Sequence, residues 1–192
     1  MPITYFPAAG YRRMPWKNGA GTTTEIAVSP AGSGLDEFDW RLAIADLERS
    51  GPFSSFPGVD RLLMLLPPGE VTLEIDGRQR TMAPLDVIAF AGESVVLASL
   101  GSGPARDLNL MLRRGRVEAT MATVTLDAER RVAVDGSLIV LCVIEGAIEV
   151  ESNGARVVLE ALDSALVEPG ESRDFTLRPA RRAVVAAIAI RA

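Results

Sequence analysis

Hydrophobic and polar positions alternate in two stretches of this chain, and the two stretches follow the same plan. In the first, an apolar run at 62–66 leads through a Gly turn to residues 71–75, where Val, Leu and Ile alternate with Thr and Glu. A period of two is typical of a strand with one buried face. The Asp76-Gly77 pair that follows favours a tight hairpin, because Asp and Gly adopt positive φ at low cost.

The second stretch repeats these features further along the chain. Its apolar run covers 138–144, and four features recur at an almost constant spacing, namely Gly69 as Gly146, Gly77 as Gly154, Leu85-Asp86 as Leu162-Asp163, and Gly92-Glu93-Ser94 as Gly170-Glu171-Ser172. Each copy therefore predicts four strands, separated by a Gly turn, an Asx-Gly turn and a Leu-Asp turn.

This order of strands and turns resembles a cupin half-barrel, and two copies indicate a bicupin. The predicted fold class is all-β, with two cupin-like β-barrel or jelly-roll modules in one chain. We expect residues 1–115 to form the N-terminal module and residues 116–192 the C-terminal module, packed together as one compact unit. A β-sandwich of unrelated function is the structural alternative.

Composition and charge narrow the possible functions. Of the 192 residues, 48% are hydrophobic and only 5% aromatic, which predicts a mainly aliphatic core. No apolar run approaches the roughly 20 residues that span a bilayer, so we expect a cytoplasmic protein with no membrane partner. A net charge of −5 without a basic stripe argues against nucleic acid as a partner. The single cysteine, Cys142, lies in an apolar run and is expected in the core.

The chain contains no histidine, and this absence bears on metal chemistry. Metal-dependent cupins hold their ion largely with His, and Val95 and Arg173 stand about where the later His of each module is expected. A site of two His and one carboxylate is impossible, and one Cys cannot replace it. We therefore expect no metal, no cofactor and no transition-metal mechanism.

Arg61 is a candidate anion-binding residue. It follows a turn-rich loop that contains Phe53 and Ser54, and it stands close to the position of the metal-binding Glu in metal-dependent cupins. An arginine there would convert a cation site into an anion site, because a planar guanidinium binds a carboxylate through two parallel hydrogen bonds. The alternative is an ordinary surface pair between Asp60 and Arg61.

The segment 14–28 has no counterpart in the second module. Its structural interpretation is that Trp16 caps the end of the barrel and Asn18-Gly19 forms a tight turn. Its functional interpretation is that Lys17, Asn18 and the backbone amides of a Gly-rich turn direct donors at an anionic or carbonyl oxygen. The segment matches neither a P-loop nor a dinucleotide fingerprint, and the residues leave both interpretations open.

The strand predicted at 40–47 places Arg41 on the same face as Ala43 and Ala45. An arginine beside small side chains leaves room for a ligand, although an exposed arginine would give the same pattern.

The strand predicted at 106–111 carries Asp107, Asn109 and Met111 on one face. A buried Asp and Asn need hydrogen-bond partners, which either the basic side chains or a ligand could supply. The equivalent strand of the second module, 183–190, is wholly apolar. We therefore expect the pocket in the first module and a filled core in the second.

Four motifs in this order resemble the HutD/Ves family. They are Trp16-Lys17-Asn18-Gly19-x-Gly-x-Thr-x-Glu25-Ile26, Trp40-Arg41-Leu42-Ala43-Ile44-Ala45, Gly51-Pro52-Phe53-Ser54-x-Phe56-Pro57-Gly58-Val59-Asp60-Arg61 and Arg106-Asp107-Leu108-Asn109. The resemblance implies a bicupin fold, an association with bacterial histidine degradation, and a regulatory role that senses a formylated or formimino-glutamate intermediate. No catalytic activity is securely attached to this family, and its Ves branch is not tied to the histidine pathway. One departure is Ala43, where many relatives are expected to have Ser.

The leading hypothesis is a non-catalytic protein that binds a small anionic metabolite. Arg61, Lys17 and Arg41 would hold a carboxylate, and the asparagines would contact an amide, formyl or formimino group. The predicted ligand-binding residues are Lys17, Asn18, Gly19, Thr22, Glu25, Arg41, Phe53, Ser54, Arg61, Asp107 and Asn109. The alternatives are a metal-independent hydrolase or isomerase with Glu25 or Asp107 as general base, and a scaffold that binds another protein. A homodimer is compatible with each of these hypotheses, because cupin sheets often pair through exposed edges.

Overall fold

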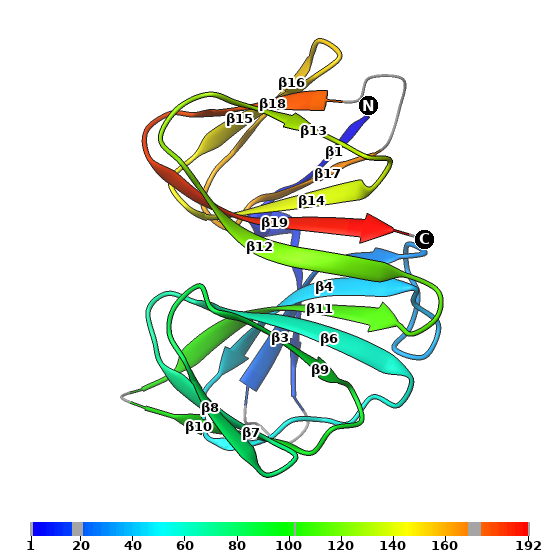
Figure 1. The fold of residues 1–192 in the computed structure, drawn as a ribbon, viewed down its shortest axis with the longest axis vertical. Coiled ribbons are helices and arrows are strands. Elements are labelled where there is room, and N and C mark those ends of the chain that lie inside the picture. The colour runs from blue at the N-terminus through cyan, green and yellow to red at the C-terminus, as the bar shows by residue number, and fades with distance from the viewer. Residues whose placement is uncertain (1, 17–20, 102, 169–173, 192) are drawn as a thin grey trace. The chain divides into compact units, whose positions relative to one another are not determined.

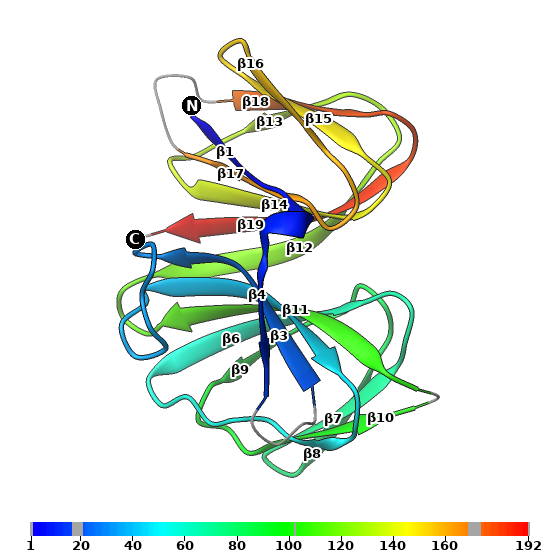
Figure 2. The same cartoon turned by 180° about the vertical axis from the view of Figure 1, so that it is seen from behind.

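The computed structural model describes residues 2–16, 21–101, 103–168 and 174–191, and these form mostly strands (Figures 1 and 2). The chain divides into two compact units, Arg12–Val117 and Met1–Tyr11 with Glu118–Ala192. Each unit is built from two antiparallel sheets, so the all-β prediction is confirmed. In the part of the chain that the structure describes, no helix has the length and apolarity needed to cross a bilayer.

The unit Arg12–Val117 contains a six-stranded and a four-stranded sheet. The six-stranded sheet has the order β2 (Arg12–Pro15), β3 (Gly21–Ser29), β4 (Trp40–Leu47), β11 (Ala105–Arg113), β6 (Val59–Leu66) and β9 (Val87–Ala91). The four-stranded sheet has the order β5 (Gly51–Pro52), β10 (Val96–Leu100), β7 (Val71–Ile75) and β8 (Arg78–Met82). Its core is aliphatic: Leu63 and Leu65 of β6 form one buried cluster with Val71, Leu73 and Met82.

The other unit follows a similar plan. Its five-stranded sheet has the order β1 (Ile3–Phe6), β17 (Ser164–Val167), β14 (Leu138–Glu145), β19 (Ala183–Arg191) and β12 (Glu118–Leu126). Its four-stranded sheet has the order β13 (Arg130–Ala133), β18 (Asp174–Pro179), β15 (Ile148–Ser152) and β16 (Ala155–Leu159). A short 3-10 helix, η1 (Ala8–Gly10), follows β1. Aliphatic side chains and Phe175 fill the core between these strands.

The internal repeat that the sequence predicts is present in the backbone. Strands β6 to β9 and β14 to β17 follow the same order, and the turns between them match. Asp76 and Asn153 both have a φ of 50°, while Leu85 and Leu162 have φ values of 72° and 70°. The last repeated feature, residues 170–172, lies outside the described residues.

The N-terminal residues lie in the unit formed with 118–192, and not with residues 12–115 as we expected from the sequence. Ile3 pairs with Val167 at the edge of the five-stranded sheet. The Tyr5 hydroxyl donates to Asp163 Oδ2 at 2.8 Å, and the backbone N–H of Ala8 donates to Asp163 Oδ1 at 2.8 Å. Backbone pairing and these side-chain bonds therefore attach β1 to its unit.

Candidate functional site

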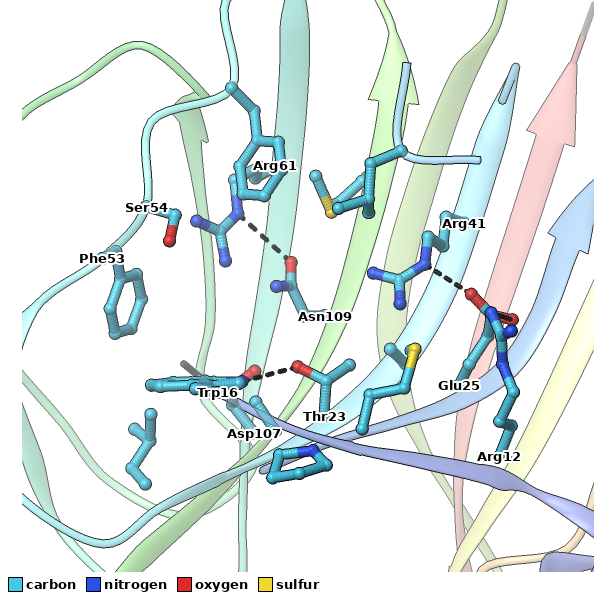
Figure 3. A pocket seen from close by; sticks show the side chains of 18 of the residues that line it. Arg12, Trp16, Thr23, Glu25, Arg41, Phe53, Ser54, Arg61, Asp107 and Asn109 are labelled. Carbon is cyan, nitrogen blue, oxygen red and sulfur yellow. Dashed lines mark hydrogen bonds and ion pairs between the residues drawn. The ribbon is translucent and has the colours of Figure 1, made fainter. Parts of the chain in front are cut away.

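A cavity of about 600 Å³ lies in the unit Arg12–Val117 (Figure 3). This volume is within the range typical of small-molecule sites. Side chains from strands β2, β3, β4, β6 and β11 line it, together with the loops around 33–35 and 52–56. Its lining residues are Arg12, Met14, Pro15, Trp16, Thr23, Glu25, Ser33, Gly34, Leu35, Arg41, Ala43, Ala45, Leu47, Pro52, Phe53, Ser54, Phe56, Arg61, Asp107, Asn109 and Met111.

The strand register brings the polar lining residues together. Side chains of directly paired residues in neighbouring strands point to the same face of a sheet. Three rows of paired residues cross the six-stranded sheet in this way, namely Thr23–Ala45–Asp107, Glu25–Ala43–Asn109 and Arg41–Met111–Arg61. The two alanines at the centre of β4 have small side chains, so space remains above the sheet between the polar groups.

Arg61 is buried, with 6% of its surface exposed. Its Nε donates to Asn109 Oδ1 at 3.4 Å, and its Cζ lies 5.2 Å and 5.0 Å from the ring centroids of Phe53 and Phe90. Burial lowers the pKa of Arg61 to about 10, while the negative charge of Asp107 raises it. Among the described residues Arg61 forms no ion pair, so no described acid competes with an anion for its remaining donors.

Arg41 has a different environment, because an acid already holds it. Its Nε donates to Glu25 Oε2 at 2.7 Å, and Arg12 Nη2 donates to Glu25 Oε1 at 3.1 Å. Both oxygens of Glu25 are therefore bound to arginines. Figure 3 shows Asn109 between the guanidinium groups of Arg61 and Arg41, and the register places the Cα atoms of these two arginines two strand spacings apart, about 10 Å.

Asp107 is the most deeply buried charged group of the cavity, at 1% exposure. Its Oδ1 has no hydrogen-bond partner among the described residues. Burial raises the pKa of Asp107 to about 7, the positive charge of Arg61 lowers it, and the negative charge of Asp46 raises it. This carboxyl group therefore keeps its proton to a higher pH than an exposed aspartate does.

The structure brings together most of the predicted site residues that it describes. Those that line the cavity are Glu25, Arg41, Phe53, Ser54, Arg61, Asp107 and Asn109. Thr22 does not line it, because Thr22 pairs with Asp46 and the alternation along β3 turns its side chain to the face opposite Thr23. Lys17, Asn18 and Gly19 lie outside the described residues.

Sequence reasoning missed Arg12, Thr23 and Phe56 as lining residues. Thr23 stands two residues before Glu25 and so shares its face of a strand, which means that a signal for Thr23 was present in the sequence. Trp16, a cap of the barrel end in one of the two interpretations of segment 14–28, lines the cavity and donates from Nε1 to Thr23 Oγ1 at 2.8 Å. Arg12 had no signal, because its role depends on the pairing of β2 with β3.

Acidic side chains are too dispersed in the described part of the chain to form a metal site. No three Cys, Asp or Glu residues there come together in a way that could hold an ion. The donors that face the cavity are mainly guanidinium and amide groups, which suit an anion with carbonyl or carboxylate oxygens.

The fold and the cavity define a bicupin with an arginine-lined pocket in one module. A cupin 2 conserved barrel domain protein from Leptotrichia buccalis has the same fold, with a TM-score of 0.62 over 94% of this chain and 96% of that one, at 8% identity. The chain belongs to the HutD family, whose model matches residues 8–185.

Two relatives and a solved structure of this family are similar to the chain. An uncharacterised 21.2 kDa protein in the hutC 3' region of Pseudomonas putida is 40% identical over 78% of each chain. Protein Ves from Citrobacter koseri is 44% identical over 56% of this chain and 58% of its own. The structure of HutD from Pseudomonas fluorescens, described in a formate condition, has a TM-score of 0.82 at 33% identity and covers both chains fully. The family name HutD refers to histidine utilisation.

Proposed function

We propose that this protein binds a small carboxylate metabolite without transforming it, and that it serves as a sensor or regulator in histidine utilisation. The observation that carries the proposal is Arg61, a buried guanidinium without an acidic partner among the described residues. A buried guanidinium is costly when no acid binds it directly, and Asp107 acts on Arg61 only through its charge, so a ligand carboxylate at this position would supply a direct partner.

The neighbours of Arg61 suit a ligand with more than one polar group. Asn109 accepts from Arg61 through Oδ1, which leaves its amide N–H groups for a carbonyl oxygen of the ligand. The Cα atom of Arg41 lies about 10 Å from that of Arg61 across the sheet. Arg41 can bind a second carboxylate with the donors that Glu25 does not occupy. A dicarboxylate with a formamide or formimino group, such as a formyl- or formimino-glutamate, has this set of groups.

The comparisons support the choice of ligand class. The family name refers to histidine utilisation, and the HutD relative from Pseudomonas fluorescens is described in a formate condition. Formate is a one-carbon carboxylate, the kind of group that a buried guanidinium binds.

Isothermal titration calorimetry tests the proposal. The ligands are N-formyl-L-glutamate, formiminoglutamate, urocanate, glutamate and formate, each titrated into the wild type, Arg61→Met and Arg114→Met. Met keeps an apolar side chain among the phenylalanines, while Arg114 is an exposed arginine paired with Asp60 and Glu93. We expect at least one ligand to bind, and Arg61→Met to weaken it by roughly 30-fold or more. Absence of heat with the whole panel, or equal affinity for Arg61→Met, contradicts the proposal.

A second candidate function is hydrolysis of a small formylated amino acid, and Asp107 favours it. A carboxyl with a pKa of about 7 inside a cavity is suited to general acid-base catalysis. Asp107 would take a proton from water as the oxygen adds to the formyl carbon, and would return it to nitrogen as the C–N bond breaks to give formate and an amine. If the wild type releases formate and Asp107→Asn abolishes this release, hydrolysis is supported. If the wild type releases no formate, the binding function alone remains. Glu25 is a poor base, because two arginines hold its oxygens.

A further inference from the structure

The carboxyl group of Asp107 is buried in the cavity, and the described residues do not supply all of its hydrogen bonds. Asp107 is 1% exposed, lines the cavity and has no hydrogen-bond partner for Oδ1 among the described residues. Leaving a buried oxygen without a hydrogen-bond partner destabilises the folded protein. Such groups are rare in folded proteins and call for an explanation, and a ligand in the cavity provides one.

One charged group on each neighbouring strand acts on the charge of Asp107. On β6, Arg61 attracts the carboxylate, and on β4, Asp46 repels it. The other charged side chains that line the cavity are Glu25, Arg41 and Arg12, and both of these arginines bind Glu25. Arg61 is therefore the main group that favours ionised Asp107, and it is also the group that the proposed ligand would neutralise.

We propose that Asp107 is the specificity-determining residue of the cavity, an inference that rests on the proposed function. Asp107 stays protonated in the complex and donates its O–H to an oxygen of the ligand. The anionic ligand then binds together with one proton from solvent. Asn109, which accepts from Arg61, lies two residues from Asp107 on β11, about 7 Å along the strand. A small extended metabolite anchored at Arg61 would span this distance.

Electrostatics favour the protonated form in the complex. A ligand carboxylate at Arg61 cancels the charge that attracts ionised Asp107, and it adds a negative charge nearby. Both effects raise the pKa of Asp107 above its value in the empty cavity. A neutral carboxyl also supplies the donor that a formamide or carboxylate oxygen needs.

This role selects among ligands that the proposed function leaves open. A formyl oxygen accepts a hydrogen bond from protonated Asp107, whereas a cationic formimino group only donates and requires ionised Asp107. The cavity is therefore expected to prefer an N-formyl over an N-formimino amino acid.

The pH dependence of affinity tests the inference, with N-formyl-L-glutamate as the probe. Its carboxylates stay ionised between pH 6 and pH 8, so the ligand itself does not titrate. If only protonated Asp107 binds, the binding-competent fraction falls about tenfold over this range, because the pKa in the empty cavity is about 7. We expect Kd to rise about tenfold from pH 6 to pH 8. Calorimetry in phosphate and in Tris at pH 8, whose ionisation enthalpies differ, should show uptake of close to one proton.

Two variants provide the controls. Asp107→Asn keeps a donor at the site but cannot titrate, so its Kd should change less than twofold between pH 6 and pH 8. Asp60→Asn removes an exposed carboxylate of β6 that pairs with Arg114, and it should keep the tenfold change of the wild type.

The outcomes separate this inference from the proposed function. Equal wild-type affinity at pH 6 and pH 8, tighter binding at pH 8, or preference for formiminoglutamate overturns the role of Asp107 and leaves the binding function intact. Absence of binding at pH 6 overturns both.

Discussion

Replacing Asp107 by Asn should stabilise the protein, and the gain should grow with pH. Asn has nearly the same shape but stays neutral, so the variant removes the cost of a buried carboxylate. The native state holds the Asp107 proton up to about pH 7, whereas an unfolded Asp loses it near 3.8. Between these values the native state binds more protons than the unfolded state, so wild-type stability falls as pH rises.

The size of the effect follows from the pKa of Asp107. A rise from 3.8 to about 7 corresponds to about 4 kcal/mol of lost stability above pH 7. Part of this loss is already present at pH 5, which leaves about 3 kcal/mol to appear between pH 5 and pH 8. The stability difference between Asp107→Asn and the wild type should widen by about this amount.

Urea unfolding followed by tryptophan fluorescence measures this difference. Trp16 and Trp40 both lie in the unit Arg12–Val117, so their emission reports on the unit that contains Asp107. Asp60→Asn is the matched control, because its carboxylate is half exposed and should not widen the difference. A gap that stays constant with pH, or an Asp107→Asn variant that is less stable than the wild type at pH 8, would refute the reasoning.

Three further predictions concern the fold. Gly21→Ala should lower stability by about 1–3 kcal/mol in urea unfolding, because its added Cβ would overlap the backbone oxygen of Asp46. Asp163→Ala should lower the melting temperature in circular dichroism more than Tyr5→Phe, since Asp163 accepts two backbone bonds besides that of Tyr5. Cys142 should not react with a thiol reagent at pH 8 until the protein unfolds, because burial raises the pKa of its thiol to about 11.

Local patterns predicted the strands of the repeat well. The hairpin pairs Asp76-Gly77 and Asn153-Gly154 determine their own backbone conformation, so the turns could be located without tertiary information. The position of β1 could not be predicted in this way. Its partners on β17 lie near the other end of the sequence, and no local pattern specifies such a pairing.

The site shows the same division between local and long-range information. Alternation along β11 predicted correctly that Asp107 and Asn109 share a face. Which side chains complete the cavity depends on the register between strands, and this register brings Arg12 to Glu25. The choice between Thr22 and Thr23 likewise depends on which face of β3 is turned to the cavity.

The side-chain NMR signals of the arginines test the central claim most directly. The Nε–Hε signal of Arg61, assigned by its loss in Arg61→Lys, should shift saturably as N-formyl-L-glutamate is added. The signal of the exposed Arg114 should stay in place. An Arg61 signal that does not move at saturating ligand would contradict the claim that this buried guanidinium binds the metabolite.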